Sequence, residues 1–194
     1  DENKVFGQIM YIKKGSLVET QNKDLKRGDI FTHINGQQLT ISNYQNLLAQ
    51  TNEDHTLTYL RLADTGWEEK GTITLNTAEF AENPSFLHKV IDAENNHKIG
   101  YYVYNFFAVG PTATSTQYND EMNEIFAEFK SAGITDLIVD LRYNSGGAEG
   151  ATIRLASLIG NNISSSDVFT RREYNPGYQA AIVKQLGSSY LLKK

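Results

Sequence analysis

The first 76 residues carry hydrophobic positions with the two-residue period of β-strands. The expected strands cover residues 6–12, 30–34, 56–62 and 70–75. Asn35-Gly36, directly after the strand expected at 30–34, is a strong signal for a hairpin turn. Ser42, with Gln45 three residues later, resembles a capping box and predicts a short helix over 42–50. This part of the chain is therefore predicted to be a small β-rich module.

After residue 98 the pattern changes to alternating strands and helices. We expect strands at 99–107 and 137–141 and helices at 119–132 and 150–159, with Gly133 ending the first helix. A strand–helix–strand order favours parallel pairing. The sequence thus predicts three segments, namely the β-rich module at 1–76, a connector at 77–98 and an α/β region at 99–194.

The connector contains Asn83-Pro84, which interrupts regular structure. Its apolar residues between 86 and 91 predict one or two amphipathic turns.

Composition narrows the class of protein. The 194 residues have 40% hydrophobic residues, a net charge of −5 and no cysteine. An acidic balance argues against a nucleic-acid partner, and no disulfide or thiolate metal site can form. The absence of cysteine suits an oxidising compartment such as the periplasm. No apolar stretch reaches the roughly 20 residues of a membrane span, so membrane anchoring would require a segment outside this sequence.

The most informative stretch is the run 135–147, in which an apolar strand ends in a polar, glycine-closed turn before a helix. Strand ends of this kind gather ligands because free backbone N–H groups converge there. Gly146 and Gly147 let the main chain approach a ligand closely. An ordinary strand-to-helix turn is the alternative interpretation.

The same run resembles the Asp-Leu-Arg-x-Asn-x-Gly-Gly signature of the C-terminal processing (tail-specific) peptidases, which are serine–lysine proteases. The similarity covers about residues 85–172 and implies the first part of a crotonase/ClpP-like α/β peptidase core. In that family the glycine closing the turn supplies a backbone N–H to the oxyanion hole, a place that Gly147 occupies. By the same resemblance Gly146 and Asn144 support the turn, and we expect the Asn144 side chain to bond the main chain.

The β-rich module resembles a PDZ domain, most specifically in Gly28-Asp29 and Ile34-Asn35-Gly36. A PDZ domain binds a peptide C-terminus as an added strand. The resemblance places the carboxylate loop near 5–7, the docking edge at 8–12 and the facing helix at 42–50. The peptide-binding residues implied are Phe6, Gly7, Gln8, Ile9, Met10 and Leu47. A PDZ-shaped lid or spacer is the alternative.

The chain departs from the peptidase family in one respect. The expected serine lies in a Thr-Ala-Ser-Ala-Ser-Glu-like run, and the lysine follows about 25 residues later; neither is found. The serines at 164–166 and 188–189 lack the strand-to-helix context of a nucleophile, and Lys184, Lys193 and Lys194 lie in a polar tail. We therefore expect a fragment without its Ser/Lys half, inactive by itself.

The sequence gives little support for a metal site, a cofactor or another kind of catalytic site. The four histidines show no metal-binding spacing, so we expect no metal and no cofactor. Asp140 could act as a general base, but beside Arg142 a structural carboxylate is the preferred interpretation. Glu149 is open to the same two interpretations.

The resemblance implies a serine-type endopeptidase of the bacterial cell envelope or periplasm, with a possible lipoprotein anchor. Its partners would be protein or peptide substrates with free C-termini, and an exposed strand edge makes an oligomer possible. Two alternatives remain. One is a non-catalytic peptide-binding or scaffold protein of the same fold, and the other is a binder of apolar ligands.

Overall fold

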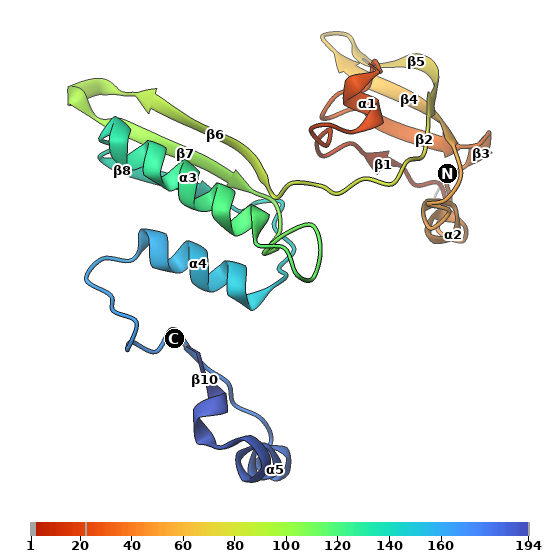
Figure 1. Cartoon of the computed structure of the whole chain (residues 1–194). Coiled ribbons are helices and arrows are strands. Elements are labelled where there is room, and N and C mark those ends of the chain that lie inside the picture. The colour runs from red at the N-terminus through yellow and green to blue at the C-terminus, as the bar shows by residue number, and fades with distance from the viewer. Residues whose placement is uncertain (1–2, 22, 194) are drawn as a thin grey trace. The chain divides into compact units, whose positions relative to one another are not determined.

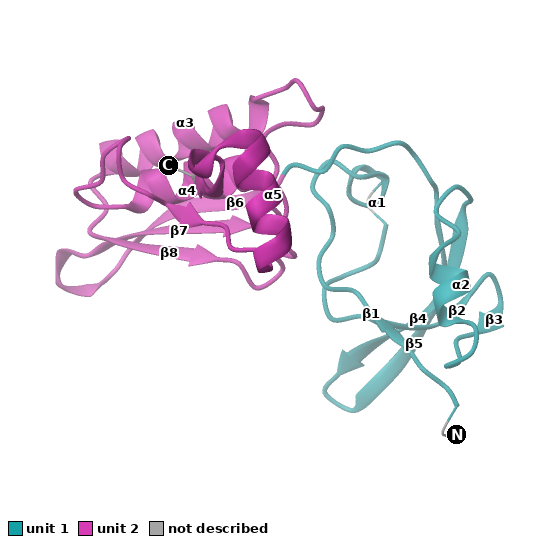
Figure 2. Cartoon of the chain, turned by 90° about the horizontal axis from the view of Figure 1, so that it is seen from below, with its two compact units in different colours: residues 1–83 teal, residues 84–194 magenta. Residues whose placement is uncertain are grey.

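The computed structural model describes residues 3–21 and 23–193. The chain divides into two compact units, Asp1–Asn83 and Pro84–Lys194 (Figure 2). Each unit has its own cluster of buried apolar side chains, so each is described by itself.

The first unit is an antiparallel sheet with two short helices (Figure 1). Its strands are β1 (Gly7–Gln8), β2 (Ile30–Ile34), β3 (Gln37–Gln38), β4 (His55–Ala63) and β5 (Gly66–Leu75), and its helices are α1 (Leu17–Thr20) and α2 (Tyr44–Leu48). The strand order is β1-β2-β4-β5, with β3 paired to β2, which leaves β1 at an edge of the described sheet. Asn35 and Gly36 form the β2–β3 turn with φ of 50° and 74°, which confirms the hairpin signal.

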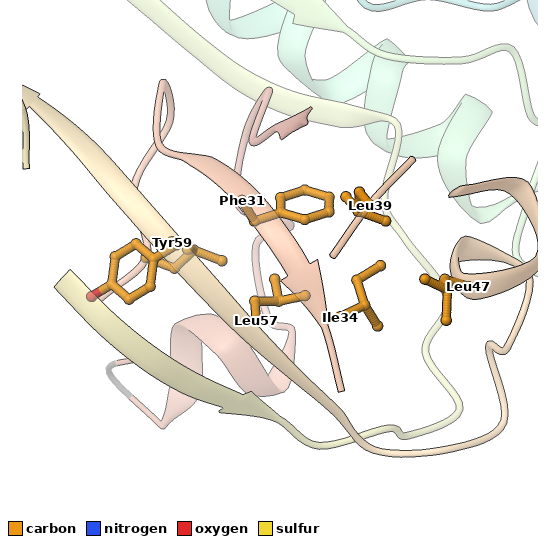
Figure 3. Packing of buried hydrophobic residues seen from close by; sticks show 7 residues of the cluster. Phe31, Ile34, Leu39, Leu47, Leu57 and Tyr59 are labelled. Carbon is orange, nitrogen blue, oxygen red and sulfur yellow. The ribbon is translucent and has the colours of Figure 1, made fainter. Parts of the chain in front are cut away.

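Buried side chains from β2, β4, α2 and the residue after β3 form the core of this unit (Figure 3). They include Phe31, Ile34, Leu39, Leu47, Leu57 and Tyr59. A charged pair closes one side, since Arg61 donates to the carboxylate of Asp29 at 2.7 Å and Asp29 is 1% exposed. The Gly28-Asp29 element therefore anchors the segment before β2 to strand β4.

The second unit begins with a three-stranded sheet. Its elements are β6 (Ser85–Asp92), the 3-10 turn η1 (Glu94–Asn96), β7 (Lys98–Tyr104), α3 (Gln117–Ala132), β8 (Asp136–Asp140) and α4 (Glu149–Ile159). β6 pairs antiparallel with β7, and β7 pairs parallel with β8. The strand–helix–strand order therefore gives the parallel pair that the sequence predicts.

Helix α3 packs its apolar side onto β7. Met122, Ile125 and Phe129 are almost fully buried with Tyr102 and Tyr104. The helix ends at Gly133, whose φ of 68° is the left-handed C-cap expected there.

A smaller C-terminal part follows α4. It contains β9 (Thr170–Arg171), α5 (Pro176–Leu186), the 3-10 helix η2 (Ser188–Leu191) and β10 (Leu192–Lys193), and β9 pairs with β10. Among the described residues no helix is long and apolar enough to cross a membrane.

Three local predictions are corrected by the structure. The strand expected over 6–12 is only Gly7–Gln8, although Ile9 continues the backbone pairing with Asp29 at 2.8 Å. The helix expected over 42–50 is Tyr44–Leu48, and Ser42 does not cap it, because Asn43 occupies the N-cap position.

The third correction concerns the connector. Residues 85–92 form strand β6 rather than amphipathic turns, since they pair antiparallel with β7, with one register shift between Ser85 and Leu87. A short apolar run alone does not distinguish these two outcomes.

Candidate functional site

The turn after β8 begins with a buried carboxylate. Asp140 is 8% exposed and accepts hydrogen bonds from Arg142 Nε at 2.9 Å and from the Tyr101 hydroxyl at 2.6 Å. The hydrogen bonds from Arg142 and Tyr101 hold the pKa of Asp140 well below its usual value, against the opposing effect of burial. A carboxylate engaged in this way ties the end of β8 to its neighbours and is a poor general base.

Asn144 defines the shape of the turn. Its side-chain Nδ2 donates to the Tyr104 carbonyl at the end of β7, at 3.0 Å. Its Oδ1 accepts from the Gly146 N–H at 2.8 Å. The Asn144 carboxamide therefore makes one bond within the turn and a second bond that links the turn to the end of β7.

Gly147 is bracketed by two backbone hydrogen bonds. Phe107 donates its N–H to the Gly146 carbonyl at 2.8 Å and accepts from the Ala148 N–H at 2.7 Å. In parallel pairing the residue between two such bonds turns its own N–H and C=O away from the partner strand. Among the described residues the Gly147 N–H has no hydrogen-bond partner.

Only glycine fits at position 147. Its φ is +137°, and a Cβ there would lie 2.1 Å from the Phe107 carbonyl oxygen. Gly146 also has a positive φ of +102°, but a Cβ at that position meets nothing within 4 Å. The close approach to Phe107 therefore places the Gly147 N–H, which lies just before helix α4. A donor at a helix N-terminus suits a developing negative charge.

A second site lies in the first unit. An apolar cavity of about 330 Å³ opens between strand β1 and helix α2. The residues lining it are Val5, Phe6, Gly7, Leu39, Ile41, Tyr44 and Leu48. Phe6 and Leu48 are 63% and 49% exposed, so the cavity offers apolar surface to a partner.

The peptide-binding residues expected from the PDZ resemblance are only partly brought together in the groove that this cavity forms between β1 and α2. Phe6 and Gly7 line the cavity, whereas Gln8, Ile9 and Met10 do not. Leu47 is wrong as a groove residue, because it is 4% exposed and packs in the core (Figure 3).

The residues that sequence analysis missed as groove residues include Tyr44 and Leu48. They stand four positions apart on α2 and share one helix face. That spacing was the available signal, and it selects Leu48 rather than Leu47.

The edge strand also offers backbone groups. Val5 and Ile9 donate their N–H groups to Leu39 at 3.1 Å and to Asp29 at 2.8 Å. Because N–H directions alternate along a strand, the intervening N–H groups of Phe6 and Gln8 face the open edge. The groove therefore combines an apolar cavity with backbone donors.

Position 7 has no room for a side chain. A Cβ on Gly7 would lie 2.0 Å from the ring of Phe31. The φ of Gly7 is not positive, so packing alone excludes a larger residue there.

Residues 98–189 match the family model described as peptidase family S41. The expected resemblance to the C-terminal processing peptidases is thereby confirmed. The matched segment contains β7, α3, β8 and α4, and with them the turn that carries Gly147.

Among solved structures, the chain is similar to a crystal structure from Bacteroides fragilis NCTC 9343 of a protein classed as an S41 protease. The two share 24% sequence identity with a TM-score of 0.68, and the match covers 90% of this chain and 45% of that chain. The present chain thus spans less than half the length of that protein. A comparison with curated proteins finds no match.

Among the described residues, no hydrogen bond joins the serines singled out in the sequence to Lys184. Ser164 and Ser166 hydrogen-bond to each other at 2.6 Å in an exposed loop, and the serines at 188–189 lie exposed in η2. Lys184 is exposed on α5, without the burial that a lysine base requires.

Two further groups have structural partners. Glu149 forms an ion pair with Arg172, which ties α4 to the segment after β9. In the part of the chain that the structure describes, no group of three or more His, Cys, Asp or Glu side chains could hold a metal ion.

Proposed function

We propose that this chain is the part of a serine-type endopeptidase that recognises protein C-termini and supplies one oxyanion donor. The serine nucleophile and the lysine base would come from residues outside this sequence. The observation that carries the proposal is the unpaired N–H of Gly147, held in place by the two bonds to Phe107. The match of residues 98–189 to the family model of peptidase family S41 supports it.

In the proposed reaction the serine Oγ attacks the peptide carbonyl carbon while a neutral lysine takes the hydroxyl proton. The carbonyl oxygen becomes negatively charged in the tetrahedral intermediate. A preorganised N–H aimed at that oxygen is worth roughly 3–4 kcal/mol in the transition state. The leaving amine then receives the proton, and water releases the acyl group from the serine.

The groove of the first unit would select the substrate. A peptide could add to the open edge of β1, with its C-terminal carboxylate near the N–H groups of Phe6 and Gln8. Its last side chain would enter the cavity beside Tyr44 and Leu48. The apolar lining favours an apolar C-terminal residue.

The bacterial cell envelope is part of the same proposal. It is supported by the family resemblance and by a sequence without cysteine. Anchoring as a lipoprotein would depend on residues outside this sequence.

The binding part of the proposal can be tested on the chain itself. A peptide with an apolar C-terminal residue should bind, and amidation of its carboxylate should weaken binding at least tenfold, since charge-assisted hydrogen bonds are worth about 1.5–3 kcal/mol each. NMR titration should show shifts at Phe6, Gly7 and Leu48. Equal affinity for acid and amide would reject capture of the carboxylate.

The catalytic part needs the complete protein, with Gly147 replaced by glycolic acid through semisynthesis. This change exchanges the N–H for an ester oxygen and adds no Cβ. We expect kcat to fall about 100- to 1000-fold with little change in KM, because the charge exists mainly in the transition state. The melting temperature should fall only slightly, because this N–H has no partner among the described residues and the ester merely weakens the Gly146 carbonyl as the acceptor for Phe107.

An ester at Ala148 is the matched control. It removes the bond to Phe107, so it should lower the melting temperature. Normal turnover with the Gly147 ester would show that the Gly147 N–H takes no part in catalysis. Peptide binding by an intact protein that cleaves nothing would favour the non-catalytic scaffold.

A further inference from the structure

A buried carboxamide lies at the end of β7 without any hydrogen bond of its own. Asn105 is 3% exposed, and neither its Oδ1 nor its Nδ2 has a partner among the described residues. Its backbone is paired normally, since its N–H donates to the Pro84 carbonyl at 3.0 Å.

The hydroxyl groups of Tyr102 and Tyr104, which precede Asn105 on β7, both have hydrogen-bond partners. The Tyr102 hydroxyl bonds the Ser85 hydroxyl at 2.8 Å, and the Tyr104 hydroxyl donates to the Ala108 carbonyl at 3.3 Å. An unpaired buried polar group destabilises the fold and is rare in native proteins. Leucine has the same branching as asparagine and would avoid that cost, so the amide at position 105 calls for a functional reason.

The position of Asn105 supplies that reason. The preceding residue, Tyr104, holds Asn144 through its carbonyl, and two residues later Phe107 brackets Gly147. The unpaired amide therefore lies inside the segment that places the oxyanion turn. Gly146 and Gly147 lie in this turn with positive φ, and glycine adopts either sign of φ without a steric penalty.

We propose that Asn105 is a positioning residue for Gly147. Its carboxamide is unpaired in this structure and hydrogen-bonds the main chain of the 144–147 turn in a second arrangement, which a bound peptide favours. This inference rests on the proposed function for its catalytic consequence, but not for the conformational exchange itself.

The catalytic consequence is tested in the complete protein with Asn105→Leu, and with Asn105→Ala in case leucine is too large. Asn105→Leu should melt no lower than the parent, and in both variants kcat should fall at least tenfold while KM stays within twofold. Asn119→Leu is the control, because its Oδ1 is also buried without a partner but lies on α3. Its kcat should be unchanged. A lower melting temperature with normal kcat in both Asn105 variants would assign the amide a structural role and overturn the proposal.

The exchange is tested separately on the 194-residue chain by NMR relaxation dispersion. The Gly146 and Gly147 amides and the Asn105 side-chain NH₂ should show a common millisecond exchange, while the helix-capping Gly133 amide stays flat. Asn105→Leu should remove the exchange at both turn glycines. Flat profiles in the parent chain would reject the second arrangement. A parent enzyme that cleaves no peptide would instead reject the proposed function and leave this measurement decisive.

Discussion

The two adjacent glycines of the turn have different reasons to be glycine. At position 146 a side chain meets open space and only the positive φ opposes it, whereas at position 147 it also meets the Phe107 carbonyl oxygen at 2.1 Å. We expect Gly146→Ala to lower the free energy of unfolding by about 1–2 kcal/mol. Gly147→Ala should cost at least about 3 kcal/mol, since overpacking adds to the strain.

Urea unfolding of both variants in the same chain measures this difference. Equal losses would show that the close approach of Phe107 is not maintained in solution. Gly147→Ala is thus unsuitable as a neutral variant in kinetic work, although it retains the N–H.

A second prediction at this scale concerns acid. The pKa of Asp140 is lowered from 3.8, first by the Arg142 hydrogen bond. A carboxyl whose folded pKa lies below its unfolded pKa stabilises the fold fully above the unfolded value and loses that contribution as the pH falls below it. Asp140→Asn should therefore lower the free energy of unfolding by about 1.5–3 kcal/mol at pH 7, and by progressively less below pH about 4.

Asp136, at the other end of β8, provides the comparison. Its side chain is 51% exposed and pairs with His97 at 2.6 Å, so Asp136→Asn should have a smaller effect that salt reduces further. A pH-independent loss in Asp140→Asn would contradict an ionised, hydrogen-bonded Asp140.

In helix α2, one of two neighbouring leucines contributes to stability and the other to the proposed binding groove. Leu47 is 4% exposed and faces the core, whereas Leu48 is 49% exposed and lines the cavity. Leu47→Ala should reduce the free energy of unfolding by about 2–5 kcal/mol. Leu48→Ala should change stability by less than about 0.5 kcal/mol and weaken binding of an apolar C-terminal peptide.

Chemical unfolding combined with peptide titration separates the two effects. If Leu48→Ala bound peptide as well as the parent, the cavity beside β1 would not be the binding groove.

The elements predicted best from sequence are those with local signals. Asn35-Gly36 determines its own turn, and Gly133 ends α3 because glycine adopts a positive φ without strain. β6 was missed because its ladder comes from β7, which no local pattern encodes.

The candidate site likewise has features that the local sequence predicts and features that depend on the fold. The turn at 144–147 is recognisable from its residues, but its bridge to Phe107 joins positions forty residues apart. The orphan amide of Asn105 is equally invisible in the sequence, since burial and missing partners are properties of the fold.

At the scale of the whole molecule, the second unit exposes apolar sheet surface. Leu87 on β6 and Ile138 on β8 are 40% and 49% exposed, and β8 pairs only with β7 among the described strands. Open edges and apolar patches promote association. We expect the chain to self-associate, and Ile138→Lys to shift it toward monomer in sedimentation velocity.

Leu62→Lys is the control, because Leu62 is 64% exposed on β4 of the first unit. It should leave the association unchanged. A parent chain that sediments as a monomer at all concentrations would show that the exposed sheet is not adhesive.

The contact between Gly7 and Phe31 has an evolutionary consequence. The φ of Gly7 is not positive, and the three atoms nearest to a Cβ at that position all belong to the Phe31 ring, so position 7 is constrained by the residue at position 31. A larger residue at position 7 requires a smaller one at position 31, which would open the core beneath the groove. Homologues should therefore vary at these positions as a pair, and a lineage that changes its preferred peptide through β1 must first repack its core.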